Sequence, residues 1–246
     1  MASGRKEGTG KTASHRTIIQ ELLQGDLPAQ EKTVDRISEE AQLLVTAGAS
    51  TTAHFLKTTL FFILSDATIL NRLKAEVEGA MPDPATLPPS HELARLPYLA
   101  AVIKEGGRMT HGVSSRLARI APNEDLRFGD YLMPAGTSIG TSHPLQHGSP
   151  AIFPEPERFD PQRWLQGEES QRRERYLVNF SRGARACVGI NLAKAELLLT
   201  LTAVVRRFDL QLYETVRERD ADLMHDFAIP YTSVESKGVR VVAQKC

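Results

Sequence analysis

Residues 180–189 read FSRGARACVG and directly precede a long apolar stretch with helical spacing. Cys187 lies between Gly183 and Gly189 and follows two arginines. Glycine allows a tight turn and the close approach of a flat ligand, and arginines and a following helix N-terminus favour the thiolate form of cysteine. A lone cysteine is more often a small buried apolar residue. The complete pattern instead predicts a loop that presents a cysteine thiolate to a metal.

Composition excludes several classes of protein. The chain has 246 residues, 41% of them hydrophobic, and its 30 basic residues balance its 30 acidic residues. Because the charges balance, nothing favours a nucleic-acid partner or an anionic membrane. Its two cysteines, Cys187 and Cys246, argue against a disulfide scaffold and suit a reducing compartment. The longest apolar run, 60–64, is too short to span a bilayer, and the N-terminus has no signal-peptide pattern.

Hydrophobic periodicity predicts a mainly α fold with short β-strands. Helices are expected at residues 17–23, 35–64, 68–78, 98–108 and 190–208. Strands are expected at residues 116–120, 137–139 and 237–243. Residues 81–97 form a proline-rich loop with at most a short helical turn, and residues 148–181 lack periodicity.

A small-residue motif, AGASTT, occupies residues 47–52 in the middle of the longest predicted helix. Inside a helix, glycine at position 48 lowers helix stability by about 1 kcal/mol relative to alanine, so its presence needs a specific explanation. Ala47 and Thr51 are four residues apart and therefore share a face. One interpretation is close approach of a flat ligand to this face. The other is a Thr51 hydroxyl that bonds back to the Ala47 carbonyl in a packing notch.

An acidic and a basic residue, Glu105 and Arg108, are three positions apart in the motif KEGGR. An exposed pair at this spacing contributes only a few tenths of a kcal/mol. Two further arginine motifs follow in the irregular segment: Arg158 in the string PERF and Arg163 in the string PQRW.

Together the four motifs, in this order, resemble the cytochrome P450 family, with Cys187 in the position of the proximal iron ligand. The resemblance implies haem b as cofactor and the C-terminal portion of the P450 fold. Residues 15–246 would be the haem-binding part of such a domain, without its N-terminal half, and residues 1–14 are expected to be disordered. Helix faces that the missing half would cover are expected to be exposed.

The resemblance also implies roles for the other motif residues. Thr51, with Ser50, would deliver protons, although the family usually has an acid where Ser50 stands. Glu105, Arg108 and Arg163 would form a structural triad; Arg163 is preferred to Arg158 because it lies 24 residues before Cys187. The residues expected to contact haem are Ala47, Gly48, Phe180, Gly183 and Gly189, with Arg185, then Arg119 or Arg116, at a propionate. His147 matches a position where relatives often carry histidine.

The function that the resemblance implies is monooxygenation of a hydrophobic small molecule, by analogy with fungal members that oxidise terpenoid or polyketide secondary metabolites. Electrons would come from an NADPH-cytochrome reductase docking near Arg182 and Arg185. Full-length relatives are expected on the cytoplasmic face of the endoplasmic reticulum. No anchor is evident in this chain, so its location is either cytoplasmic or left open. Two alternatives remain: a truncated, non-catalytic haem-binding product, and a haem-thiolate rearrangement or dehydration enzyme, which Ser50 favours.

Overall fold

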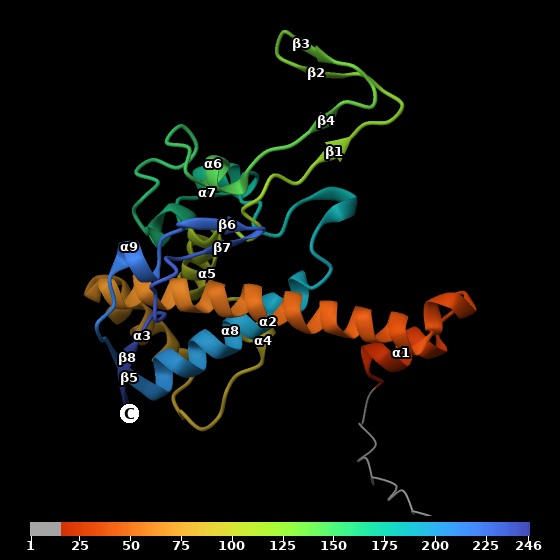
Figure 1. The fold of residues 1–246 in the computed structure, drawn as a ribbon. Helices are drawn as coiled ribbons and strands as arrows, with labels where there is room; N and C mark the ends of the chain where they lie inside the picture. The colour runs from red at the N-terminus through yellow and green to blue at the C-terminus, as the bar shows by residue number, and fades with distance from the viewer. Residues whose placement is uncertain (1–15) are drawn as a thin grey trace, which may run out of the picture. The chain divides into compact units, whose positions relative to one another are not determined.

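The computed structural model describes residues 16–246 in two units, each considered by itself: one ends at Ala49 and the other is Ser50–Cys246 (Figure 1). The segment 1–14, expected to be disordered, lies outside the described residues. The first unit contains α1 (Ile18–Gln24), a 3-10 helix η1 (Ala29–Lys32) and the beginning of α2 (Val34–Ser65). Thr17 starts α1 with a capping box, in which it exchanges hydrogen bonds with Gln20.

The second unit contains the remainder of α2 and most of the other helices. These are α3 (Ala67–Ala80), α4 (Ser90–Leu93), α5 (Pro97–Thr110), α6 (His143–His147), α7 (Glu168–Glu174), α8 (Ile190–Arg207) and α9 (Arg217–Asp220). Two 3-10 helices, η2 (Pro161–Trp164) and η3 (Gly183–Arg185), interrupt the irregular segments.

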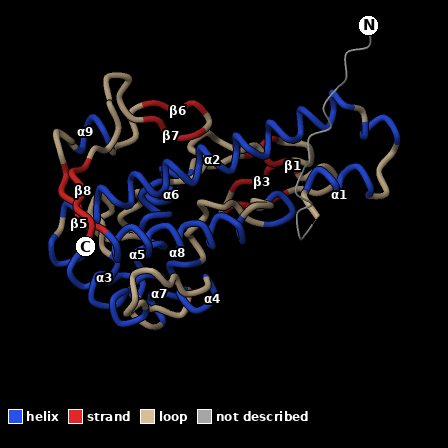
Figure 2. Tube along the Cα trace, turned by 90° about the horizontal axis from the view of Figure 1, so that it is seen from below, coloured by secondary structure: helices blue, strands red, loops and turns tan. Residues whose placement is uncertain are grey.

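Helices α3, α5 and α8 pack together around the main core of the second unit (Figure 2). Their fully buried residues include Leu73, Leu99 and Leu201. Side-chain hydrogen bonds to backbone N–H groups fix where α3 and α5 begin. Asp66 caps α3 by accepting hydrogen bonds from two backbone N–H groups. Glu76 of α3 accepts hydrogen bonds from the first N–H groups of α5, so α3 fixes where α5 begins.

The strands of the described chain form four two-stranded antiparallel sheets. They pair β1 (Arg119–Ile120) with β4 (Ser138–Ile139), β2 (Leu126–Phe128) with β3 (Tyr131–Met133), β5 (Phe208–Leu212) with β8 (Val241–Lys245), and β6 (His225–Phe227) with β7 (Ile229–Tyr231). The C-terminal β8 runs beside β5 (Figures 1 and 2), where Leu210 faces Ala243.

The mainly α fold with short strands agrees with the sequence prediction, and the five predicted helices are present with ends shifted by at most two residues. Three expectations need correction. Residues 116–118 precede β1 instead of belonging to it. The C-terminal strand begins at Val241, four residues later than expected. The segment 148–181, expected to lack periodic structure, contains η2 and α7.

The expected exposure of apolar helix residues is found in the described chain. On α8, Leu192 is 60% exposed, and Val45 of α2 is 71% exposed. No single described helix is long and apolar enough to cross a membrane; only α2 and α3 taken together, bent by 110° at the break between them, reach that length and composition.

Candidate functional site

A buried carboxylate, Glu105 of α5, accepts hydrogen bonds from four residues. Arg108 donates through Nε (3.0 Å) and Nη2 (2.8 Å), and Arg163 donates through Nε (3.0 Å). The indole N–H of Trp164 (2.8 Å) and the backbone N–H of Asp160 (2.8 Å) complete the set. All three charged side chains are at most 4% exposed. Because every lone-pair direction of the carboxylate has a donor, its charge is compensated inside the core.

The two buried arginines also hold the irregular segment that follows α6. Arg108 donates to the backbone carbonyls of His147 (3.1 Å), Pro156 (2.7 Å) and Arg158 (3.0 Å), and Arg163 donates to that of Pro154 (3.1 Å). The Arg158 side chain is 65% exposed and forms only a long ion pair with Glu155. The structure therefore brings Arg163, and not Arg158, to Glu105.

Gly106 and Gly107 of α5 allow close contacts that the sequence does not reveal. A Cβ at Gly106 would lie 2.3 Å from Thr59 Oγ1 and 2.9 Å from the Phe55 ring, and one at Gly107 would lie 2.7 Å from Asn179 Nδ2. Glycine is needed at position 106 because real Cβ atoms do not approach so closely, whereas a Cβ at position 107 would require the amide end of Asn179 to shift. The motif KEGGR thus combines a charged pair with two packing notches.

The cysteine loop between Phe180 and α8 is closed by backbone hydrogen bonds. The Cys187 N–H donates to the Phe180 carbonyl (2.8 Å), and the Ala186 N–H donates to the Gly183 carbonyl (3.0 Å). Gly183 has φ +71°, in the left-handed region that favours glycine. Cys187 is exposed, and its Sγ lies 3.9 Å from where a Cβ at Gly189 would stand. The thiol is thus held beside Gly189, the N-cap residue of the 18-residue helix α8.

These residues fit the thiolate-ligated haem that the sequence predicts. The donor is a soft thiol next to the N-cap residue of a long helix. No heavy atom lies within 4 Å of the Cβ position of Gly183, and the neighbouring Val188 is 94% exposed. Open space at Gly183 and an exposed apolar side chain therefore lie near an accessible sulfur, which suits a flat apolar ligand.

Of the three arginines proposed for a propionate, Arg185 belongs to the cysteine loop and Arg119 contacts it. Arg119 of β1 donates to Ser181 Oγ at 3.2 Å, which brings its charge from a segment distant in sequence. Arg185 is exposed and has no hydrogen bond or ion pair within residues 16–246. Arg116 is also exposed.

Ser50 and Thr51 lie on α2, and both are exposed. Ala47 and Gly48, at the end of the first unit, are exposed as well. A Cβ at Gly48 would meet no atom within 4 Å in the described chain. Packing of these residues therefore gives no reason for glycine at position 48, and close approach of a ligand remains a prediction.

A histidine cluster beside Arg108 was not foreseen as a group. The rings of His111 and His147 are stacked with centroids 5.7 Å apart, and the His143 ring lies 6.1 Å from that of His147. Burial lowers the pKa of His147 to about 2 and the pKa of His111 to about 4. Burial also lowers the pKa of His54 to about 4. These three rings are therefore neutral at physiological pH.

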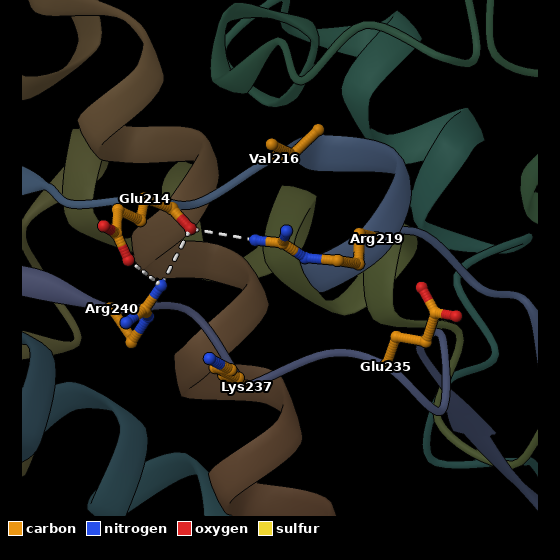
Figure 3. A pocket seen from close by; sticks show the side chains of 6 residues that line it. All are labelled: Glu214, Val216, Arg219, Glu235, Lys237 and Arg240. Atoms are coloured by element: carbon orange, nitrogen blue, oxygen red, sulfur yellow. Dashed lines mark hydrogen bonds and ion pairs between the residues drawn. The ribbon is translucent and has the colours of Figure 1, made fainter.

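A charged cleft of about 380 Å³ lies elsewhere in the second unit (Figure 3). Its lining residues are Glu214, Val216, Arg219, Glu235, Lys237 and Arg240. Arg219 and Arg240 both point toward Glu214 and donate to its backbone carbonyl, and Arg240 also pairs with its carboxylate. Within the cleft Arg240 pairs with Glu214, and Arg219 pairs with Asp220 beside it. None of the lining residues belongs to the predicted site.

Comparison with known proteins identifies the relatives of the chain. The family model described as Cytochrome P450 matches residues 3–236. The chain is 45% identical, over 93% of its length, to a cytochrome P450 monooxygenase of Ascocoryne sarcoides and 42% identical, over 93%, to one of Sordaria araneosa. It is 41% identical, over 98% of its length, to an N-acetyltryptophan 6-hydroxylase of Emericella nidulans. It covers 45%, 45% and 48% of these proteins, so it spans about half the length of the curated relatives it matches.

Proposed function

This chain belongs to the cytochrome P450 family, and we propose that residues 15–246 are the haem-binding part of a monooxygenase in which Cys187 ligates the iron of haem b. The observation that carries the proposal is the exposed Cys187 thiol at the N-terminus of α8, in a loop closed by the Cys187–Phe180 backbone hydrogen bond. Bound through a thiolate, haem activates dioxygen so that one oxygen atom can be transferred to a substrate.

The residues around Cys187 bind and orient the cofactor. Gly183 and Gly189 leave room for a flat ring beside the sulfur, and Phe180 supplies apolar contact. Backbone N–H groups near Gly189 lower the electron density on the sulfur by hydrogen bonding. Arg185 supplies positive charge to one propionate, and Arg119 or Arg116 supplies it to the other. Support for Arg119 is its hydrogen bond to Ser181 in the same loop.

The roles of the α2 residues rest on the family resemblance alone: Ala47 and Gly48 would allow close approach of the cofactor to this helix. The Thr51 hydroxyl would hold and donate a proton, and Ser50 would pass protons from water to it. A hydroxyl can relay a proton but does not carry a negative charge at neutral pH, so Ser50 is a weaker relay than a carboxylate. The buried triad of Glu105, Arg108 and Arg163 would keep α5 and the segment before the cysteine loop in place.

The substrate of the proposed enzyme is a hydrophobic small molecule of fungal secondary metabolism. Terpenoid and polyketide intermediates are the first class to test, and indole amino acids form the second, because one relative is named an N-acetyltryptophan 6-hydroxylase and another a tryptophan 6-hydroxylase. The electron donor is an NADPH-cytochrome reductase. Its proposed docking surface includes Arg182 and Arg185, which are exposed beside the cysteine.

The carbon monoxide difference spectrum of the reduced, haem-loaded chain tests this proposal. The wild-type protein is expected to show the strongly red-shifted Soret band of a thiolate ligand. Cys187→Ala should abolish that band, whereas Cys246→Ala, which changes the other exposed cysteine, should leave it unchanged. A wild-type spectrum like that of free haem, or an unchanged band in Cys187→Ala, would refute thiolate ligation by Cys187.

Ser50 favours a second candidate function, a haem-thiolate rearrangement or dehydration that needs no reductase. Product formation with and without NADPH and reductase separates the two candidates. For a monooxygenase, Ser50→Asp should raise the fraction of NADPH electrons recovered in product, since a carboxylate relays protons better. A product that forms equally well without reductase would favour the rearrangement.

A further inference from the structure

The His147 ring connects α6 to the segment that leads into the cysteine loop. Its Nε2 lies 3.1 Å from the backbone nitrogen of Val178, which donates to it. The Ser181 N–H donates to the Val178 carbonyl (2.7 Å), and the Cys187 N–H donates to the Phe180 carbonyl (2.8 Å). Residues 178–181 are thus held by His147 at one end and hold Cys187 at the other.

The same histidine is joined to the buried ion network through its backbone. Arg108 Nη1 donates to the His147 carbonyl at 3.1 Å, and Arg108 is fixed by Glu105. His147 therefore has two fixed attachments: its main chain to α5 and its side chain to Val178. Its ring is 0% exposed and lies against Phe153, with ring centroids 6.2 Å apart.

The protonation of the ring supports a specific role. To accept a hydrogen bond from Val178, a neutral ring must carry its proton on Nδ1. That Nδ1 is buried and has no hydrogen-bond partner in the described chain. An apolar side chain would fill the same space without a buried, unsatisfied N–H, so packing alone does not explain a histidine here.

Asn179, next to Val178, shows how little freedom this segment has. A Cβ at Gly112 would lie 2.1 Å from the Asn179 carbonyl oxygen, and one at Gly107 would lie 2.7 Å from its Nδ2. The segment is therefore pressed against the end of α5 on one side and bonded to His147 on the other. A displacement at Val178 would pass through Asn179 and Phe180 to the backbone of Cys187.

We propose that His147 is a positioning residue for Cys187: its Nε2 accepts the Val178 N–H and thereby couples the buried Glu105–Arg108 pair to the loop that presents the thiolate. The consequence for haem rests on the proposed function, whereas the hydrogen bond itself can be tested without haem.

The first test uses the unmodified chain, labelled with ¹⁵N. The imidazole ¹⁵N shifts of His147 should show a protonated Nδ1 and an unprotonated Nε2, and a scalar coupling should connect Nε2 to the Val178 amide nitrogen. A protonated Nε2, or a Val178 amide that exchanges as fast as an exposed amide, would overturn the proposal. This measurement needs no variant, so it decides the question even if substitutions prevent folding.

The second test compares three substitutions by amide hydrogen exchange of residues 178–187. Glutamine places an oxygen acceptor near the position of Nε2, whereas asparagine places its amide near Nδ1. His147→Phe and His147→Asn should speed exchange of the Val178 amide by about tenfold, and His147→Gln should restore protection. The matched control is His143→Phe, in the same helix and ring cluster but bonded to the His111 carbonyl instead of Val178; it should leave the Val178 amide protected. Equal exchange in all variants would overturn the proposal.

The haem-loaded proteins give the spectroscopic signature. His147→Phe and His147→Asn should convert part of the thiolate Soret band to a form without thiolate ligation, and His147→Gln should keep the wild-type band. Identical Soret bands in the wild-type protein and the three variants would show that His147 does not position Cys187. If the wild-type chain itself lacks the thiolate band, the proposed function fails, and the exchange and ¹⁵N results still decide whether His147 holds Val178.

Discussion

Glu105 illustrates what single residues decide in this chain. Its carboxylate receives hydrogen bonds from two guanidinium groups, one indole and one backbone N–H. The spacing of Glu105 and Arg108 could be read from sequence because residues three positions apart are neighbours on one face of an α-helix. The contribution of Trp164 could not, because it comes from a segment about 60 residues away. Its only sequence signal is an aromatic residue next to Arg163.

Removing one arginine from this network should strongly destabilise the fold. Arg163→Ala leaves a buried carboxylate with fewer donors, and we expect a loss of about 3 kcal/mol in the free energy of unfolding. Urea unfolding followed by circular dichroism measures it. The matched control is Arg158→Ala, in the same segment, where the side chain is exposed; a loss within about 0.5 kcal/mol is expected. Equal losses would mean that Arg163 is not the arginine that matters.

The indole of Trp164 should contribute separately from the charges. Trp164→Phe keeps a buried aromatic ring but removes the donor to Glu105 Oε2, at an expected cost of about 1–3 kcal/mol. Circular dichroism is the suitable measurement, because Trp164 is the only tryptophan of the chain. A loss below about 0.5 kcal/mol would indicate that another donor replaces the indole.

At the scale of elements, helices with regular apolar periodicity were predicted to within two residues, whereas short elements were not. The β2–β3 hairpin has a Gly129–Asp130 turn between two short segments rich in apolar residues, which is a strand-turn-strand signal. Neither strand is among those expected from the sequence. Helix α7 begins after Gly167, which has φ +57°, and its charged sequence has no apolar face from which to predict it.

Two helical glycines should respond to alanine in opposite directions. Gly106→Ala would force its Cβ against Thr59 and Phe55, and we expect a destabilisation of about 1–3 kcal/mol from overpacking. Gly79→Ala in α3 meets no neighbour within 4 Å, so helix propensity should stabilise the chain by up to about 1 kcal/mol. Thermal and urea unfolding of both variants provide the measurement. A stabilised Gly106→Ala protein would contradict the close packing between α5 and α2.

At the scale of the whole molecule, the buried histidines predict how stability depends on pH. The pKa of His147 is lowered to about 2 and the pKa values of His111 and His54 to about 4, in each case mainly by burial, from an ordinary value of 6.5. As pH falls below 6.5, the unfolded chain therefore takes up protons that the folded chain refuses.

The stabilisation by these histidines should be complete above about pH 7 and decline from about pH 6.5 toward pH 4. In that window each histidine should lower the free energy of unfolding by up to about 1.4 kcal/mol for each pH unit of acidification. Urea unfolding at a series of pH values measures how the free energy of unfolding changes with pH. His147→Gln should reduce this slope by the contribution of one histidine. The pKa of Asp226 is lowered by its hydrogen bonds from Ser114 and Ser115. Such carboxylates stop stabilising the folded chain only below about pH 4, so they do not mask the contribution of the histidines. A flat profile between pH 7 and 4 would contradict neutral buried rings.

The sequence by itself determined the family, the mainly α fold and the identity of Cys187, Glu105 and Arg108 as the residues to examine. These properties depend on local spacing and on motif order along the chain. The sequence favoured Arg163 over Arg158, and the tertiary structure brings Arg163 to Glu105. Only the tertiary structure brought Trp164 to Glu105 and Arg119 to the cysteine loop, and joined His147 to Val178. Each of these contacts connects distant segments, and a residue type alone does not reveal which partner the packed backbone brings within hydrogen-bonding distance.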